Sequence, residues 1–309
     1  MKFRITHSTL YQYSQPVGLC QNEARLQPRN FCHQYCDNSH FEIQPRPVDF
    51  RERLDFFGNR VVYFAIQQAH TQLNVTAISE VTLLPRANRL DSFNQIPWEQ
   101  AQSMLQEAPT LSQQQGPSGQ SQQQIPSLDL LDARQYVLDS PMISISQELA
   151  DYARPSFVPN RPLVQVAHNL MARIFNDFTY DPSFTTIATP LSDVLSFRRG
   201  VCQDFAHLAI ACLRAFGIAA RYISGYVETL PEPGKPRLVG ADASHAWFSV
   251  YIPGSGWLDF DPTNNTLLHE QHITLGWGRD YADVTPLKGI ALGGGQHTLS
   301  VSVDVLRLG

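Results

Sequence analysis

Several kinds of segment are missing from this sequence of 309 residues, and each absence narrows the possible functions. It has no long run of Lys and Arg, and its formal net charge is −5. Nucleic-acid binding depends on basic side chains that displace counterions, so we expect no nucleic-acid partner. No apolar run approaches the ~20 residues that a membrane-spanning helix needs, so we expect no membrane span. The N-terminal MKFRITHSTLYQYSQP lacks the apolar core of a secretory signal, so we expect a cytoplasmic protein.

Cysteine is also scarce. The five cysteines are Cys20, Cys32, Cys36, Cys202 and Cys212. An odd number in a chain without a signal sequence favours free thiols over a disulfide framework. The motif FCHQYC places two of them around a histidine, but no second pair of ligands follows at the spacing of a metal site. We therefore expect no metal there and predict local packing for these thiols.

Alternation of apolar and polar residues dominates the first part of the chain. Residues 2–13 and 53–84 follow the period of two that is typical of strands, and Gly58-Asn59 marks a turn inside a hairpin. These patterns predict an all-β, sandwich-like domain over residues 1–88. The chain is long enough for a second structured region, and 43% hydrophobic residues can fill two cores.

The composition changes beyond this domain. Between positions 113 and 124, seven of twelve residues are glutamine. Such a segment cannot bury a core, so we interpret residues 89–127 as a linker or insert.

Residues 128–309 begin with helical patterns and end with strand patterns, which predicts an α+β domain. A helix is expected after Pro162, a short one with Thr189 as its cap, and a third from Cys202 to about Gly217. The apolar stripe predicted for the first is Val164, Ala167, Leu170, Met171, Ile174 and Phe175. Strands are expected in IAARYISGYV, in ASHAWFSVYIPGSGWLDFDPT and in the tail HTLSVSVDVLRL, which could return to the N-terminal domain.

Cys202 occupies the predicted start of a helix, directly after Gly200-Val201. Unpaired backbone N–H groups and the positive end of the helix dipole favour a thiolate there, and the same N–H groups could bind an oxyanion. Considered alone, Cys202 is better explained by its place at the top of an apolar stripe, because buried structural cysteines are common. Cys212, farther along the helix, is expected to be a core thiol.

His245 and Asp261 lie on two strands that we expect to form a hairpin. Alternation places His245 and Trp247 on one strand face, and Asp259 and Asp261 together on one face of the next. A four-residue loop would set His245 opposite Asn264, and a three-residue loop at 252–254 would set it opposite Asp261. Asp259 competes with Asp261 for the same role.

The three residues together fit a Cys-His-Asp triad, in which Cys202 attacks an acyl carbon, His245 moves the proton and Asp261 orients the imidazole. Here RRGVCQDFAHLAIACLRAFGIAARYISGY and GADASHAWFSVYIPGSGWLDFDPTNN closely resemble the cysteine helix and the histidine and aspartate strands of the transglutaminase-like superfamily. The resemblance covers most of the chain outside the glutamine-rich insert. It extends to bacterial members described as candidate cysteine proteases, with a β-rich N-terminal domain.

The resemblance implies a papain-like core, with the thiol helix against an antiparallel sheet, and acyl chemistry through a thioester on Cys202. It implies a peptide or protein amide substrate, no metal and no cofactor. Tyr180 and Trp247 are candidates for substrate or oxyanion contact, and Asp204 is a candidate for either that role or a dipole-complementing one. The resemblance favours hydrolysis by a peptidase or amidase, since many bacterial members are thought to be hydrolases. The alternatives are a protein-glutamine transamidase and a non-catalytic binding module, and no feature indicates an oligomeric state.

Overall fold

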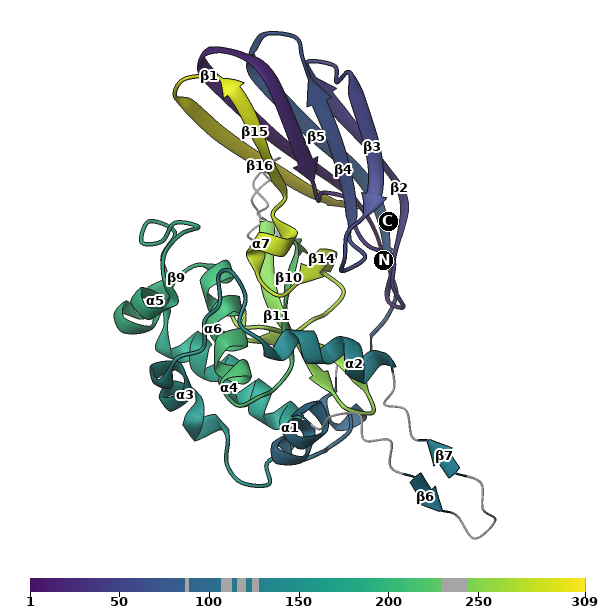
Figure 1. Ribbon diagram of the computed structural model, residues 1–309, viewed down its shortest axis with the longest axis vertical. Coiled ribbons are helices and arrows are strands. Elements are labelled where there is room, and N and C mark those ends of the chain that lie inside the picture. The colour runs from purple at the N-terminus through teal and green to yellow at the C-terminus, as the bar shows by residue number, and fades with distance from the viewer. Residues whose placement is uncertain (87–88, 107–112, 116–120, 124–127, 229–243, 309) are drawn as a thin grey trace, which may run out of the picture. The chain divides into compact units, whose positions relative to one another are not determined.

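The computed structural model describes residues 1–86, 89–106, 113–115, 121–123, 128–228 and 244–308 (Figure 1). Its contacts group into two compact units. Unit 1 comprises Met1–Ala87, Ile223–Ala246 and Leu268–Gly309, and unit 2 comprises Asn88–Tyr222 and Trp247–Leu267. The strands β10 (Ala220–Val227) and β11 (Ser244–Ile252) contribute residues to both. The domain borders expected at 88 and 127 stay predictions.

Unit 1 is built around a long first strand, β1 (Lys2–Ala24). The other strands of its sheet are β2 (Gln34–Gln44), β3 (Asp49–Leu54), β4 (Arg60–Ile66), β5 (His70–Leu83), β15 (Leu287–Gly293) and β16 (His297–Arg307). The first half of β1 pairs with β5 and β16, and its second half pairs with β4 and β15. The two ends of the chain, purple and yellow in Figure 1, therefore lie side by side in one antiparallel sheet.

The predicted β-rich start of the chain is confirmed. In β5, buried and less buried residues alternate as the period of two requires. The buried set includes Leu73, Val75 and Ala77, which pack in one cluster with Val62 and Phe64 of β4. The hairpin expected around Gly58-Asn59 forms between β3 and β4. Burial of this alternating apolar face fixes the register, because a slip by one residue would expose it.

Unit 2 contains the three helices that the sequence predicts, α4 (Leu163–Asp177), α5 (Leu191–Phe197) and α6 (Cys202–Arg214). It also contains three that were not predicted: α1 (Trp98–Gln106), which lies within residues 89–127 and buries Ala101 and Leu105, α2 (Leu128–Arg134) and α3 (Gln147–Ala153). Short 3-10 turns lie at Leu90–Ser92, Gln135–Val137 and Arg154–Ser156. The helix α6 packs against α3, α4 and α5, and its His207 ring lies 4.9 Å from the ring of Tyr222 in β10. It is buried on almost every side.

Two details of these helices differ from the prediction. Phe175 is 45% exposed, although the other residues of the predicted α4 stripe are buried, because its position falls at the edge of that stripe. The helix α5 begins one residue later than expected, with Pro190 as its N-cap. Thr189 does not cap it, because its hydroxyl accepts a hydrogen bond from the backbone N–H of Thr186 at 2.9 Å.

The remaining strands form one larger and two small sheets. The larger sheet has the order β13-β12-β11-β10-β14, with β12 (Gly256–Asp261), β13 (Thr266–Leu267) and β14 (His272–Gly278), and the short helix α7 (Tyr281–Val284) follows β14. The strands β8 (Thr179–Tyr180) and β9 (Arg199–Gly200) pair in parallel.

The glutamine-rich segment lies largely outside the described residues. Its described parts, β6 (Gln113–Gln115) and β7 (Ser121–Gln123), pair with each other. Within the described part of the chain, every helix is too short or too polar to cross a bilayer.

Candidate active site

Cys202 is the first residue of α6, as predicted, and it is partly exposed. The first turn of this helix is held by Asp204, whose carboxylate accepts a hydrogen bond from the backbone N–H of Val201 at 2.8 Å. A Cβ atom on Gly200 would lie only 2.8 Å from the Asp204 carboxylate, so glycine is required there for space. Gly200 and Asp204 therefore fix the backbone on both sides of the thiol.

Asp204 is 3% exposed. Burial raises the pKa of its carboxyl group, while the Val201 N–H and the hydroxyl of Thr185 act in the opposite direction. Its observed contact is a helix-capping one, which satisfies a backbone donor that would otherwise have no partner. A role toward substrate stays a prediction.

Tyr180 lies beside the start of α6. It is the partner of Gly200 in the β8–β9 pairing, and its ring meets that of Phe205 edge-on with centroids 6.4 Å apart. Burial raises the pKa of its phenol, and the neighbouring Cys202 and Asp204 side chains raise it further. At 52% exposure its hydroxyl remains open to solvent, so a contact with substrate or oxyanion is sterically allowed and stays a prediction.

The β11–β12 hairpin has a register that differs from both expected alternatives. Phe248 pairs with Phe260, and Ile252 pairs with Gly256, so the turn consists of residues 253–255. The turn is tied to Asn94, which donates from its side chain to the Pro253 carbonyl at 2.9 Å and from its backbone to Ser255 Oγ at 2.9 Å. Extending this register along β11 sets His245 level with position 263, between the two expected partners Asp261 and Asn264.

This register decides between the two faces that the sequence left open. Tyr251 is paired with Trp257 and Ser249 with Asp259, so the next pair on that face is Trp247 with Asp261. His245 precedes Trp247 by two residues on the same strand and therefore shares this strand face, as the three-residue loop would have it. An interaction between the imidazole of His245 and the carboxylate of Asp261 stays a prediction.

Asp261 is fully buried, and its carboxylate is held by its own turn. One oxygen accepts hydrogen bonds from the backbone N–H groups of Thr263 and Asn264, at 3.0 and 3.3 Å, and the other accepts one from Asn264 Nδ2 at 2.7 Å. These donors stabilise the ionised form and fix the orientation of the carboxylate.

Asp259 has a different environment, although it shares the face of Asp261. Its charge acts on the guanidinium of Arg221, whose pKa burial lowers to about 10 and which lies 4.1 Å above the ring of Trp257. Asp259 therefore compensates a buried cation, and the assignment of Asp261 as the carboxylate that orients an imidazole stays a prediction.

His245 belongs to a group of histidines that sequence reasoning missed. In unit 1 a ring nitrogen of His245 lies within 4.8 Å of one of His272, and the rings of His269 and His272 are 4.6 Å apart. Imidazoles are good ligands for zinc, so His245 and His272 could each offer a nitrogen to such an ion. The only available signal was the motif HEQH at 269–272. Metal binding would remove the lone pair that His245 needs as a base.

Burial distinguishes the other residues singled out from the sequence, and the role of Trp247 toward substrate stays a prediction. Trp247 is fully buried, which disfavours direct contact of its ring with a substrate. All five cysteines are free, as predicted. Cys212 is a core thiol that donates to the Leu149 carbonyl at 3.6 Å, and burial raises its pKa to about 12. Cys202 is therefore the helix's partly exposed thiol, and Cys212 its buried one.

Comparisons with known proteins identify relatives over the whole length of the chain. Residues 3–82 match the bacterial transglutaminase-like N-terminal region, and residues 151–262 match the transglutaminase-like superfamily. An uncharacterized protein of Mycobacterium tuberculosis is 42% identical over 312 residues, covering 99% of this chain and 92% of that protein. A protein-glutamine gamma-glutamyltransferase of Pseudomonas aeruginosa is 32% identical over 102 residues, covering 30% of this chain and 15% of the transferase.

A solved structure shows the same fold. It is that of a candidate cysteine protease from Cytophaga hutchinsonii, with a TM-score of 0.73 and 21% identity, covering 100% of this chain and 91% of the other. The expected α+β fold with a β-rich N-terminal region is confirmed. On these matches and on the Cys202 helix and its partner strands, the chain belongs to the transglutaminase-like superfamily.

Proposed function

We propose that the protein is a cysteine-dependent enzyme that hydrolyses amide or peptide bonds through a thioester on Cys202. The observation that carries the proposal is the position of Cys202 as the first residue of α6, with Asp204 and Gly200 holding the turn around it. A thiol at the start of a helix lies beside backbone N–H groups that can bind the oxyanion of an acyl-transfer reaction. The family assignment supports the same chemistry.

In the proposed reaction His245 accepts the thiol proton as Cys202 Sγ attacks the amide carbon. The negative charge that develops on the substrate oxygen is stabilised by backbone N–H groups at the start of α6. As the C–N bond breaks, His245 gives the proton to the leaving amine. Water, deprotonated by His245, then attacks the thioester, which releases the acid and restores the thiol. Asp261, held by Asn264, keeps the imidazole in the tautomer that each step needs.

Hydrolysis and amine transfer differ only in the nucleophile that reaches the thioester. Tyr180, beside Cys202, is 52% exposed, so water has access to this end of α6, and this favours hydrolysis. The Pseudomonas aeruginosa relative is a protein-glutamine gamma-glutamyltransferase, which makes transfer to an amine the second candidate. A non-catalytic binding module is disfavoured because the chain retains all three residues of a triad. The free state of all five cysteines supports a cytoplasmic location.

The test is covalent labelling by a peptide that carries an electrophile in place of the scissile amide, followed by intact-mass and peptide mapping. We expect one adduct, on Cys202, which Cys202→Ala abolishes. The matched control is Cys32→Ala, since Cys32 is an exposed thiol far from α6 in sequence. Labelling of Cys32 equal to that of Cys202 would overturn the proposal.

A second measurement separates the two reactions. Incubation with peptide amides, with and without an added primary amine, yields either the acid or a new amide, which mass spectrometry distinguishes. We expect the acid to predominate even at millimolar amine. Predominance of the new amide would establish the transamidase instead.

A further inference from the structure

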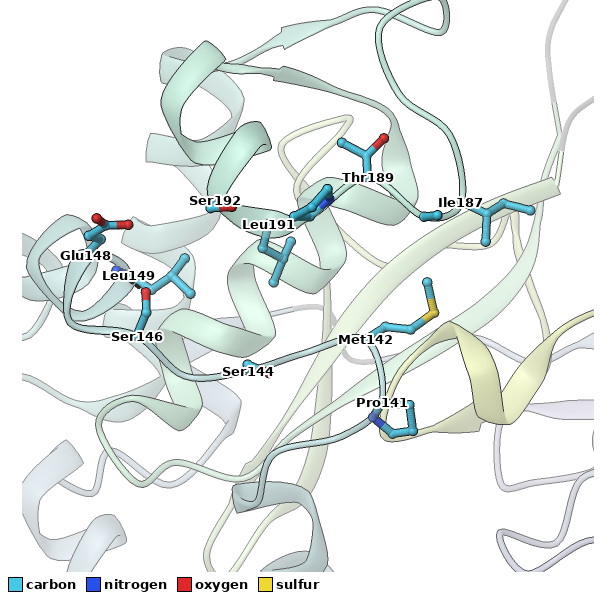
Figure 2. A pocket seen from close by; sticks show the side chains of 12 residues that line it. Pro141, Met142, Ser144, Ser146, Glu148, Leu149, Ile187, Thr189, Leu191 and Ser192 are labelled. Atoms are coloured by element: carbon cyan, nitrogen blue, oxygen red, sulfur yellow. Dashed lines mark hydrogen bonds between the residues drawn. The ribbon is translucent and has the colours of Figure 1, made fainter.

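A pocket of about 450 Å³ lies in unit 2, between the segment that leads into α3 and the segment that leads into α5 (Figure 2). Figure 2 shows Met142 and Ile187 at one end, Glu148 at the other and Leu191 between them. The pocket is therefore elongated, with aliphatic side chains along most of its length and a carboxylate at one end. Ile187 is 60% exposed, so its side chain is accessible from solvent.

The charge that lines the pocket is negative and lies at one end. Glu148 is the only charged residue among the twelve that line it. Its side chain is exposed in the first turn of α3, where it also complements the helix dipole. The nearby Ser146 hydroxyl is engaged, since it accepts the Leu149 N–H at 3.3 Å as the N-cap of α3. A ligand with an aliphatic stem and a cationic head matches this arrangement, as Lys and Arg side chains do.

A contact with α6 relates this pocket to Cys202. The carbonyl of Leu149, in the pocket wall, accepts a hydrogen bond from Cys212, which follows Cys202 by ten residues, or about 15 Å, along α6. An extended peptide advances about 3.3 Å per residue and a long side chain adds to its reach, so this distance corresponds to about three to five residues.

We propose that this pocket is a subsite for a Lys or Arg side chain of a peptide substrate, about three to five residues from the acyl group that Cys202 attacks. The aliphatic part of that side chain lies along Met142, Ile187 and Leu191, and its cationic end pairs with Glu148. The inference rests on the proposed function and adds the substrate class to it.

The test uses synthetic peptides with a single glutamine as acyl donor and one arginine placed one to six residues from it on either side. Citrulline, the neutral isostere of arginine, serves as the reference residue at each position. The measured quantity is kcat/KM for release of ammonia or of a cleaved peptide. We expect arginine to exceed citrulline by about fivefold at three to five residues and not at one, since an exposed ion pair contributes at most about 1 kcal/mol.

Substitutions of Glu148 test whether the preference for arginine over citrulline depends on its carboxylate. Glu148→Gln is expected to abolish it, and Glu148→Lys to reverse it, while labelling of Cys202 by iodoacetamide stays unchanged. Asp151→Asn is the matched control, because Asp151 is an exposed carboxylate of the same helix that does not line the pocket. An arginine preference that persists in Glu148→Gln, or that is absent at every spacing, would overturn the subsite.

Binding separates this inference from the proposed function. Fluorescein-labelled peptides of the same series are titrated with the Cys202→Ser variant, and fluorescence anisotropy gives Kd. Tighter binding of arginine than of citrulline peptides, without turnover by the native protein, would support the subsite and overturn the hydrolase. Turnover with equal Kd and equal kcat/KM for the arginine and citrulline peptides would support the hydrolase and overturn the subsite.

Discussion

Substitution of Gly200 by alanine tests whether the backbone before Cys202 is held as the structure indicates. The new Cβ would approach both the Cβ and a carboxylate oxygen of Asp204 to 2.8 Å, which is closer than non-bonded atoms allow. The Asp204 side chain is not free to move away, because it is buried and its carboxylate accepts the Val201 N–H at 2.8 Å. Either the strand β9 moves, or this hydrogen bond is lost.

Both outcomes carry similar costs in the free energy of unfolding. Overpacking of a tight site costs about 1–3 kcal/mol, and loss of a hydrogen bond to a charged acceptor costs roughly 1.5–3 kcal/mol. We therefore expect Gly200→Ala to lower the free energy of unfolding by about 2 kcal/mol. Because the displaced backbone adjoins the first turn of α6, the rate of Cys202 alkylation should fall as well.

The assays are urea denaturation followed by circular dichroism, and the rate of iodoacetamide alkylation at Cys202. Gly18→Ala is the matched control, since a Cβ at Gly18 meets no atom within 4 Å and Gly18 lies in β1. The control should match the native protein in Cys202 alkylation. If Gly200→Ala keeps the native free energy of unfolding and the native alkylation rate, Gly200 and Asp204 do not fix the backbone around Cys202.

Three further predictions follow from the site and the core. Asp261→Asn should lower kcat by roughly 10⁴-fold, because the imidazole would adopt the wrong tautomer, while Cys202 is still labelled slowly. Asp259→Asn should lower kcat far less. The reverse order of the two effects would show that Asp259 orients the base. Burial lowers the pKa of His7 to about 4 in the folded protein. Below pH 6.5 the unfolded chain therefore binds more protons at this residue than the folded protein does. The free energy of unfolding should fall by up to about 3 kcal/mol as the pH drops from 6.5 to 4. His7→Gln should flatten that dependence in urea titrations, and an unchanged slope would contradict it. Zn²⁺ should inhibit turnover reversibly by binding His245 and His272. His272→Ala should raise the inhibitory Zn²⁺ concentration at least about tenfold. Equal inhibition of the native protein and His272→Ala would exclude His272 as a ligand.

Local patterns in the sequence predict most of the elements around the candidate site. The start of α6 at Cys202 follows from a glycine, an extended residue and an apolar helical stripe. The shared face of Asp259 and Asp261 follows from alternation alone. The register of their hairpin does not, because it depends on the turn at 253–255 and on Asn94, which lies about 160 residues earlier in the chain.

The choice between the two aspartates also depends on partners distant in sequence. Asp259 and Asp261 are two residues apart on one strand face, so no periodicity separates them. Arg221 in β10 compensates the first, and Asn264 with the backbone N–H groups of its turn holds the second. The group of His245, His269 and His272 was missed for a related reason, since β11 and β14 bring these rings together from different parts of the chain.

One continuous segment, residues 179–204, carries both the turn that holds the nucleophile and one wall of the pocket. It begins with Tyr180 in β8, passes Ile187 and α5, returns through β9 and ends at Asp204. The β8–β9 pairing and the Asp204 cap fix its two ends, while the exposed side chains between them make few contacts with the core. Substitutions in the middle of this segment can therefore change which peptide is bound without displacing Cys202. Under the proposed function, the chemistry would depend on the fixed ends of this segment, and the specificity on its exposed middle.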